Sequence, residues 1–228
     1  MLKNFNKFSY PVLSRDESTG KRMYKTPSGD LVPSVTTILD KTKDKKKLDE
    51  WRARVGNDVA NKVVLEAQTI GTRMHSHLEK HILGNIFENT EYDIAYEMAN
   101  VIIDKGLKYL EEVWKAEVPL YYKNQYAGTT DLVGIYKGKP CIIDFKQTNK
   151  PKKSEWITDY YLQLCAYAHA HNSMHNTDIE NGVVLMCSRD LTFQIFEVSE
   201  LQFPKYSYMW FNRVNRYNEL SNSKPNTD

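Results

Sequence analysis

The stretch Cys141-Ile142-Ile143-Asp144-Phe145-Lys146 decides how this chain is interpreted. An apolar run leads into two charged residues that one aromatic residue separates. Side chains alternate across a strand, so Asp144 and Lys146 share a face, about 7 Å apart at ~3.3 Å rise per residue. A carboxylate there can hold a divalent cation, and an ammonium beside it can offset developing negative charge. Taken alone, the pattern also fits a strand end with a surface ion pair.

The strand predicted just before this one, over residues 128–136, adds a second carboxylate. Asp131 stands in an otherwise apolar run there. Two neighbouring strands with one carboxylate each suit a hard cation such as Mg²⁺, and a buried carboxylate needs a metal or a partner. Glu117, at the start of a strand predicted over 117–122, is a possible third acid. An exposed residue at a strand start is an equally good interpretation of Glu117.

A long amphipathic helix is predicted over residues 57–83, before these strands. Its apolar stripe consists of Val63, Ile70, Met74, Leu78 and Ile82. His75 lies beside the stripe, and Gly71, one turn earlier, lets a ligand or another backbone come close. A structural histidine and a metal ligand are both compatible with this position. His77 and His81 imitate a zinc pair at i, i+4, but we expect both to be exposed because their face lies away from the stripe.

A further helix is predicted after the Asp-x-Lys strand, over residues 154–171. Tyr160, Gln163 and Tyr167 share one face of it. Gln163 could hydrogen-bond a phosphate, a water or a base, and the tyrosines could stack on bases. A polar seam packed against the sheet is the alternative. The loop before this helix carries Lys150, Lys152 and Lys153, at a spacing that suits phosphate contacts.

The remaining segments complete an α/β pattern. A turn at 26–30 joins two short strands, Ser34 caps a helix that begins at Val35, and a second helix is expected over 92–114. A hairpin over 182–198 and a last helix, capped by Ser199 and running to Leu220, follow. We therefore predict one domain over 1–228, with a mixed β-sheet flanked by α-helices. Its parts are an N-terminal extension (1–56), a core (57–220) and a frayed tail (221–228).

Composition limits the class of protein. The 228 residues are 41% hydrophobic and 26% charged, as in a globular protein, and no run of 18 apolar residues occurs. The net charge of +2 means that contacts to nucleic acid must come from local patches. The basic segment from Lys41 to Lys47 is one candidate patch, and a solvated surface is its simpler interpretation. No GxxxxGK[ST] loop occurs, so we expect no need for ATP.

The compartment is predicted from the cysteines and the N-terminal residues. The chain has three cysteines, which are Cys141, Cys165 and Cys187. Their number is odd, they form no CxxC motif and they lie in apolar stretches, which favours buried free thiols in a reducing compartment. The first residues contain no apolar signal-peptide region, and Asp16 and Glu17 fit a mitochondrial transit peptide poorly. We therefore expect a cytoplasmic protein of a bacterial or phage-infected cell, with the mitochondrial matrix as the weaker alternative, and no membrane partner.

Four motifs in order resemble the PD-(D/E)xK nuclease superfamily, in its RecB-like exonuclease branch. They are Gly71-Thr-x-x-His75, Gly128-x-x-Asp131, Asp144-Phe-Lys146 and Gln163-x-x-x-Tyr167. The N-terminal segments are similar to those of the mitochondrial genome maintenance exonuclease family and its phage and bacterial relatives. Those segments are Tyr24-Lys-Thr-Pro-Ser-Gly, Pro33-Ser-Val-Thr-Thr-Ile-Leu39 and Leu48-Asp-Glu-Trp51.

The resemblance implies a restriction-endonuclease-like core and metal-dependent cleavage of DNA from free single-stranded ends. It implies His75, Asp131 and Asp144 as ligands of Mg²⁺ or Mn²⁺, Lys146 as the catalytic lysine and Gln163 as a supporting polar residue. The sequence departs from the family pattern at one position: Gln147 follows the lysine, where the related proteins often have Thr. We expect a monomer whose DNA contacts come from Ser34, Thr36, Arg73, Lys150, Lys152, Lys153, Tyr160 and Tyr167. The open alternatives are a structure-specific endonuclease and an inactive nucleic-acid-binding module.

Overall fold

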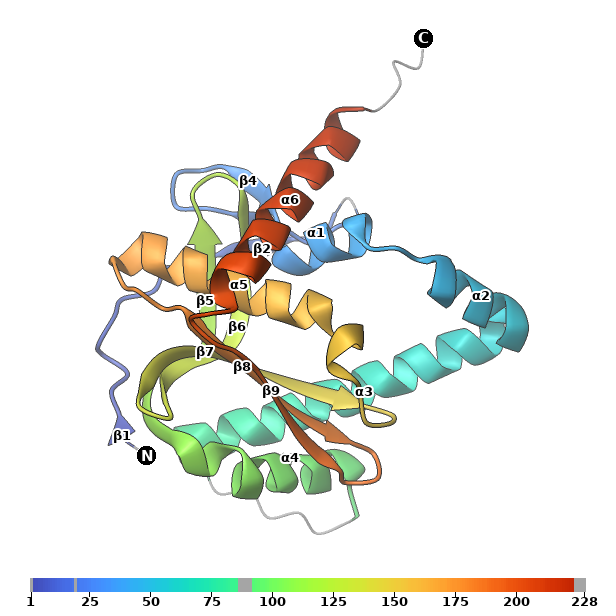
Figure 1. The fold of residues 1–228 in the computed structure, drawn as a ribbon, viewed down its shortest axis with the longest axis horizontal. Helices are drawn as coiled ribbons and strands as arrows, with labels where there is room; N and C mark the ends of the chain where they lie inside the picture. The colour runs from blue at the N-terminus through green and yellow to red at the C-terminus, as the bar shows by residue number, and fades with distance from the viewer. Residues whose placement is uncertain (1, 19, 86–91, 224–228) are drawn as a thin grey trace.

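The computed structural model describes residues 2–18, 20–85 and 92–223 (Figure 1). Its elements follow one another as β1 (Leu2–Lys3), β2 (Ser14–Asp16), β3 (Met23–Lys25), β4 (Leu31–Pro33), α1 (Val35–Thr42), α2 (Lys46–Val55), α3 (Asn57–Leu83), α4 (Ile94–Lys105), η1 (Leu107–Tyr109), β5 (Leu110–Tyr122), β6 (Tyr126–Tyr136), β7 (Lys139–Thr148), η2 (Ser154–Trp156), α5 (Thr158–His175), β8 (Asn181–Ser188), β9 (Phe193–Val198) and α6 (Phe203–Asn222).

The central sheet is mixed, as the sequence predicts. Its strands lie in the order β1-β5-β6-β7-β8-β9. The pairs β1–β5 and β7–β8 are parallel, and the pairs β5–β6, β6–β7 and β8–β9 are antiparallel. The parallel step from β7 to β8 needs a crossover, which α5 provides. A small antiparallel sheet, β2-β3-β4, lies beside β6.

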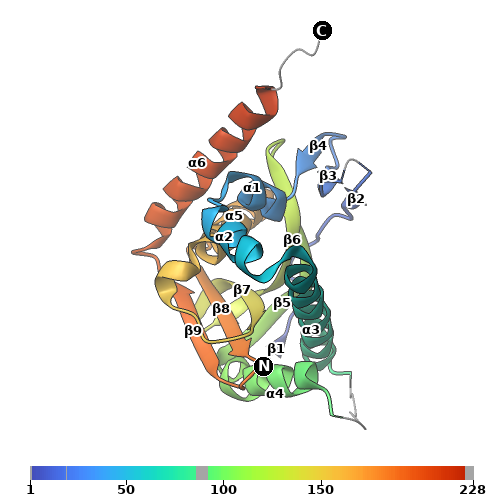
Figure 2. The same ribbon diagram turned by 90° about the vertical axis from the view of Figure 1, so that its right-hand side faces the viewer.

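Helices cover both faces of the central sheet, which explains why its strands are apolar on both sides. Ile142 packs into a core with α1, α5 and α6, whereas Ile143 packs into a second core with α3 and α4. The same alternation separates Val184 from Val183 in β8. Figure 2 shows α6 and α3 on opposite sides of the strands. The molecule therefore has three layers, with the sheet in the middle.

Several sequence predictions hold at the level of single residues. The helix α3 has the predicted bounds, the turn at 26–30 joins β3 to β4, and Ser34 caps α1 by accepting a hydrogen bond from the Thr37 N–H. Cys141, Cys165 and Cys187 are free and buried. Within the described residues, none of the helices combines the length and the apolar character that a bilayer crossing needs.

Other predictions are wrong. The helix expected over 92–114 ends at Lys105, and β5 already begins at Leu110. Ser199 does not cap the last helix, since α6 begins at Phe203 after Gln202 and runs to Asn222. The helix α2 occupies part of the basic segment and was not predicted. Part of the tail expected to fray, residues 224–228, lies outside the described residues. The division into extension, core and tail stays a prediction.

Candidate active site

The site forms where β6 and β7 separate. Their ladder ends at the pair Leu132–Ile143, although β6 stays paired with β5 and β7 with β8 beyond this point. At the separation the carboxylate of Asp131 accepts a hydrogen bond from the backbone N–H of Phe145, at 2.6 Å. A side chain of β6 thus replaces the lost backbone partner of β7, and it lies next to the Asp-x-Lys motif.

Asp144 and Lys146 form an ion pair on the face of β7 that looks toward α5. Lys146 Nζ lies 2.5 Å from Asp144 Oδ2, and Asp144 is 2% exposed. The ammonium also lies 5.2 Å from the ring centroid of Tyr160, on the first turn of α5. Asp144 is therefore buried, with the Lys146 ammonium as its partner, and the Lys146 side chain is 20% exposed. An ion pair on the open surface is thus the wrong interpretation.

The helix α3 contributes His75 from the other layer. His75 Nδ1 lies 3.2 Å from Asp131 Oδ1. Gln147, which follows Lys146, donates a hydrogen bond from Nε2 to the Ala67 carbonyl at 2.9 Å. A Cβ added to Gly71 would meet Gln147 Cγ at 3.4 Å, which is an ordinary contact, so the packing of α3 on β7 does not require a glycine here. Gln147 therefore ties β7 to the helix that presents His75.

Glu117 completes the group from β5. It lies well inside this strand, so its placement at a strand start was wrong, but the expectation that it is exposed is confirmed. Its φ of 48° is strained for a non-glycine residue. Ligand atoms of His75, Glu117 and Asp131 all lie within 4.8 Å of one another. They open into a cavity of about 440 Å³ whose lining residues are Gly71, Thr72, His75, Ser76, Glu79, Glu117 and Asp131.

The donor set fits a divalent cation. Two ligands on opposite sides of Mg²⁺ are about 4.2 Å apart at ~2.1 Å each, so the observed spread of 4.8 Å needs only a small closure. Carboxylate oxygens suit Mg²⁺, and the imidazole nitrogen is a ligand that Mn²⁺ also accepts. Asp144 lies beside this group but faces Lys146. The structure therefore gathers Glu117, the possible third acid, more closely with His75 and Asp131 than it does Asp144.

The charges of the site perturb one another. Burial raises the pKa of Asp144 to about 6, and the neighbouring Lys146 opposes this rise. Partial desolvation by the surrounding atoms also raises the pKa of Glu117, to about 7, although the residue stays exposed, and Asp131 adds to the effect. Burial alone would lower the pKa of Lys146, but the carboxylates of Asp144 and Asp131 outweigh it, and the pKa of this ammonium is raised. Lys146 therefore stays protonated and positively charged.

His75 and Asp131 stabilise each other as an ion pair. Burial disfavours both charged forms, yet the pKa of His75 is raised by Asp131, and the pKa of Asp131 is lowered by His75 together with the Phe145 N–H. Asp131 is thus held charged, whereas the pKa values of Asp144 and Glu117 are raised. A buried charged pair beside two further carboxylates is costly unless a cation belongs there.

Of the helical face predicted on α5, only part reaches the site. Gln163 is buried next to Tyr167, which makes it part of the packing of α5. Tyr167 is 2% exposed, and its hydroxyl would lie 2.8 Å from a Cβ on Gly128. The expectation that Tyr167 stacks on bases is therefore wrong. The glycine of the Gly128-x-x-Asp131 motif instead makes room for this buried phenol.

Three other predicted contacts have structural partners. Ser34 is 2% exposed and caps α1, so it offers no surface to DNA, and that assignment is corrected. Thr36 is exposed, with its hydroxyl 3.0 Å from that of Ser34. Arg73 pairs with the buried Asp93 at 2.7 Å and so secures the start of α4. A DNA contact by Thr36 or by the exposed part of Arg73 stays a prediction.

His77 is the clearest correction among the histidines. It is 9% exposed and lies 3.2 Å from Asp93, because α4 packs over the face of α3 that was expected to be free. His81 is exposed, as expected. The buried Asp93 therefore joins His77 and Arg73 of α3 to the N-terminus of α4, which is a structural role.

The lysines near the site differ in their surroundings. Lys150 and Lys153 are exposed in the connection between β7 and α5, whereas the backbone of Lys152 is fixed by two hydrogen bonds to Gln194. Lys43 and Lys45 of the basic segment both pair with Asp40. Part of the charge of that segment is thus neutralised, which favours its interpretation as a solvated surface.

Sequence reasoning missed two parts of the site. Thr72 and Ser76 line the cavity next to His75, and Gln147 links β7 to α3. Thr72 lies within the Gly71–His75 turn and Ser76 directly follows it, so their positions could have indicated the first pair. The sequence shows that Gln147 replaces the Thr that is common after the lysine. It does not show that Gln147 bonds to the Ala67 carbonyl, eighty residues away.

Comparison with known proteins supports the resemblance to PD-(D/E)xK exonucleases. The chain is 28% identical to human mitochondrial genome maintenance exonuclease 1 over 208 residues, which covers 83% of this chain and 59% of the human protein. It is 26% identical to the mouse protein of the same name over 236 residues, which covers 92% of this chain and 68% of the mouse protein. The chain thus spans about 59% of the length of the human relative.

Other comparisons add little. No family model matches the chain. A solved structure from Eubacterium rectale aligns over 67% of both chains with a TM-score of 0.45 and 16% identity, a likeness too distant to carry an argument. The named relatives do correct one expectation. They are mitochondrial proteins of vertebrates, which points to mitochondria, so the prediction of a cytoplasmic protein of a bacterial or phage-infected cell is wrong by this comparison.

Proposed function

We propose that this chain is a metal-dependent exonuclease that hydrolyses phosphodiester bonds from free ends of single-stranded DNA. The observation that carries the proposal is the convergence of Asp131, Asp144, Lys146, His75 and Glu117 where β6 and β7 separate, beside an open cavity. Relatives named exonucleases, at 26% and 28% identity, support the same reading.

The residues divide the chemistry between them. Asp131, Asp144 and His75, with Glu117 beside them, would hold Mg²⁺ or Mn²⁺. Such an ion, when bound, lowers the pKa of a water molecule and offsets charge on the phosphate. Lys146 has a raised pKa, so it donates hydrogen bonds rather than accepting a proton, and it is suited to orient the attacking water and to stabilise the phosphoryl oxygens. The water oxygen bonds to phosphorus as the bond to the 3′ oxygen breaks.

The preference for a single strand rests on charge and on the exposed groups next to the site. A net charge of +2 gives no broad basic face for two duplex backbones. Exposed Lys150 and Lys153 lie in the connection after β7, and the ring of Tyr160 lies under Lys146. Aromatic rings and a few cations are what binding of one strand needs. The chain has no nucleotide-triphosphate loop, so we expect hydrolysis without ATP.

The test compares one DNA sequence as an end-labelled linear strand, as a ligated single-stranded circle and as a blunt duplex, each with Mg²⁺. We expect rapid loss of the linear strand, slow loss of the duplex and hardly any loss of the circle. The Lys146→Ala variant, prepared in parallel, controls for contaminating nuclease. Cleavage of the circle as fast as of the linear strand would reject the exonuclease and favour an endonuclease on the same core. Binding without any cleavage would indicate an inactive binding module.

A further inference from the structure

Trp156 lies exposed next to the candidate active site. It is the last residue of η2, between the strand that carries Lys146 and the helix that carries Tyr160, and its side chain is 60% exposed. By contrast, Trp114 and Trp210 are at most 3% exposed. An exposed indole offers a large, flat apolar surface that a ligand can cover.

The turn that carries Trp156 is held firmly. The Trp156 N–H donates to the Lys153 carbonyl at 3.0 Å, and Ile157, the next residue, is 3% exposed and anchors the turn in the core. Just before the turn, Gln194 binds both the N–H and the carbonyl of Lys152, at 2.7 and 2.9 Å. The indole is therefore presented on a fixed support, so little conformational freedom would be lost when a ligand binds it.

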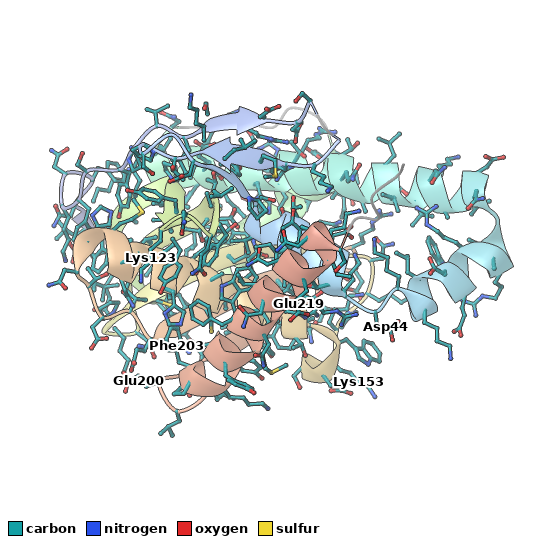
Figure 3. The ribbon with its side chains drawn as sticks, turned by 90° about the horizontal axis from the view of Figure 1, so that it is seen from above. Asp44, Lys123, Lys153, Glu200, Phe203 and Glu219 are labelled. Atoms are coloured by element: carbon teal, nitrogen blue, oxygen red, sulfur yellow. The ribbon has the colours of Figure 1, made fainter. Side chains whose placement is uncertain are left out.

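A cation accompanies the ring. Lys153 Nζ lies 5.5 Å from the centroid of the Trp156 ring, and Figure 3 shows Lys153 at the edge of the molecule, next to the start of α5. With 60% of Trp156 exposed, the ring keeps a large accessible surface besides the part that faces this ammonium. A planar ring beside a cation matches one nucleotide of a single strand, which combines a base with a phosphate.

The position connects this pair to the site. Tyr160 follows Trp156 by four residues, and its N–H donates to the Ile157 carbonyl at 2.9 Å. The Tyr160 ring lies 5.2 Å below Lys146 Nζ, so the chain leads from the candidate catalytic lysine through Tyr160 to Trp156 within about one helical turn. A strand whose scissile phosphate lies at Lys146 would pass Trp156 with a neighbouring nucleotide.

We propose that Trp156 and Lys153 form a stacking platform that binds a base and an adjacent phosphate of the single-stranded substrate. The platform rests on the proposed function, because its ligand is the strand that the nuclease site would cut. It deepens that function by naming the residue that favours unpaired bases: a base inside a duplex is already stacked on both faces and cannot use the indole.

The test measures binding of a short oligothymidylate in the Asp144→Asn background, where the strand is not digested. Replacing Trp156 by Ala should weaken binding about 5- to 150-fold, the range for removal of a stacking aromatic, and replacing it by Phe should restore most of the affinity. The strand should quench tryptophan fluorescence, and Trp156→Phe should remove most of this quenching. In the active chain, Trp156→Ala should raise KM and leave kcat unchanged.

A matched control is Tyr208→Ala on α6, which removes an aromatic side chain that is 72% exposed and lies outside the site, and which should leave binding unchanged. Unchanged affinity and unchanged quenching in the Trp156 variants, in a chain that still cleaves single strands, would overturn the platform and leave the nuclease proposal standing. A wild-type chain that neither binds nor cleaves single strands would overturn both.

Discussion

The carboxylate of Asp131 accepts a hydrogen bond from the backbone N–H of Phe145, which is the residue between Asp144 and Lys146. One side chain thereby fixes the position of β7 at the point where its ladder with β6 ends. The other oxygen of the same carboxylate lies 3.2 Å from His75. Asp131 therefore joins three elements of the site, and its structural and chemical roles can be separated by substitution.

We expect Asp131→Asn to abolish cleavage while the fold survives. The amide oxygen can still accept from Phe145, but the charge that would bind a metal is lost. Asp131→Ala removes both, and we expect it to lower the free energy of unfolding further, by about 1–3 kcal/mol, because the Phe145 N–H then loses its partner. Denaturant unfolding and single-strand cleavage measure the two effects. Full activity in the Asn variant would contradict the account.

We expect substitutions of the three α3 histidines to have different effects on activity and stability. His75→Ala should strongly reduce activity, because His75 lies against Asp131 in the cavity. His77→Ala should lower the free energy of unfolding by about 1–3 kcal/mol through the loss of its contact with Asp93, with most activity per folded molecule retained. His81→Ala should change little. Activity during metal titration, together with thermal unfolding, tests this, and equal losses of activity for all three would point to a general folding defect.

Gln147 is expected to position His75 rather than to touch the substrate. Gln147→Ala removes the hydrogen bond to Ala67 and should lower kcat more than it changes KM for DNA, because α3 then loses its tie to β7. Gln147→Glu keeps the volume but cannot donate, so it should not rescue activity. The control is Gln68→Ala on the exposed side of the same helix. A fully active Gln147→Ala chain would remove this residue from the account.

His171 should make stability depend on pH. Burial lowers its pKa to about 3 from an ordinary 6.5, and it lies between Tyr10 and Thr177 at 2.9 and 2.8 Å. Between pH 6.5 and 3 the unfolded chain therefore binds a proton that the folded chain does not, so stability falls as the pH is lowered through this window. His171→Gln should flatten the fall, as measured by urea unfolding at several pH values. An unchanged slope would show that other groups cause it.

Much of this fold could be predicted because its signals are local. The stripe on α3, the cap at Ser34 and the turn at 26–30 each depend on residues close in sequence. The start of β5 could not be predicted in this way. Register shifts near Glu112 and Lys115 break its period-two pattern, so the apolar residues Leu110, Val113 and Trp114 imitate a helix.

The candidate site was predicted in its chemistry but not in its geometry. The alternation of β7 correctly placed Asp144 and Lys146 on one face. It could not show that Asp144 turns to Lys146 while Glu117 joins Asp131, because that arrangement depends on a strained residue in a third strand. His77 was misjudged for a similar reason. Its burial comes from α4, whose packing leaves no trace in the period of α3.

The rate at which end-labelled single-stranded DNA is degraded with Mg²⁺ tests most directly whether Asp144 and Lys146 belong to a nuclease site. We expect cleavage by the wild-type chain and no detectable cleavage by Asp144→Asn or Lys146→Ala, with circular dichroism showing that both variants stay folded. Turnover retained in both folded variants would contradict this assignment.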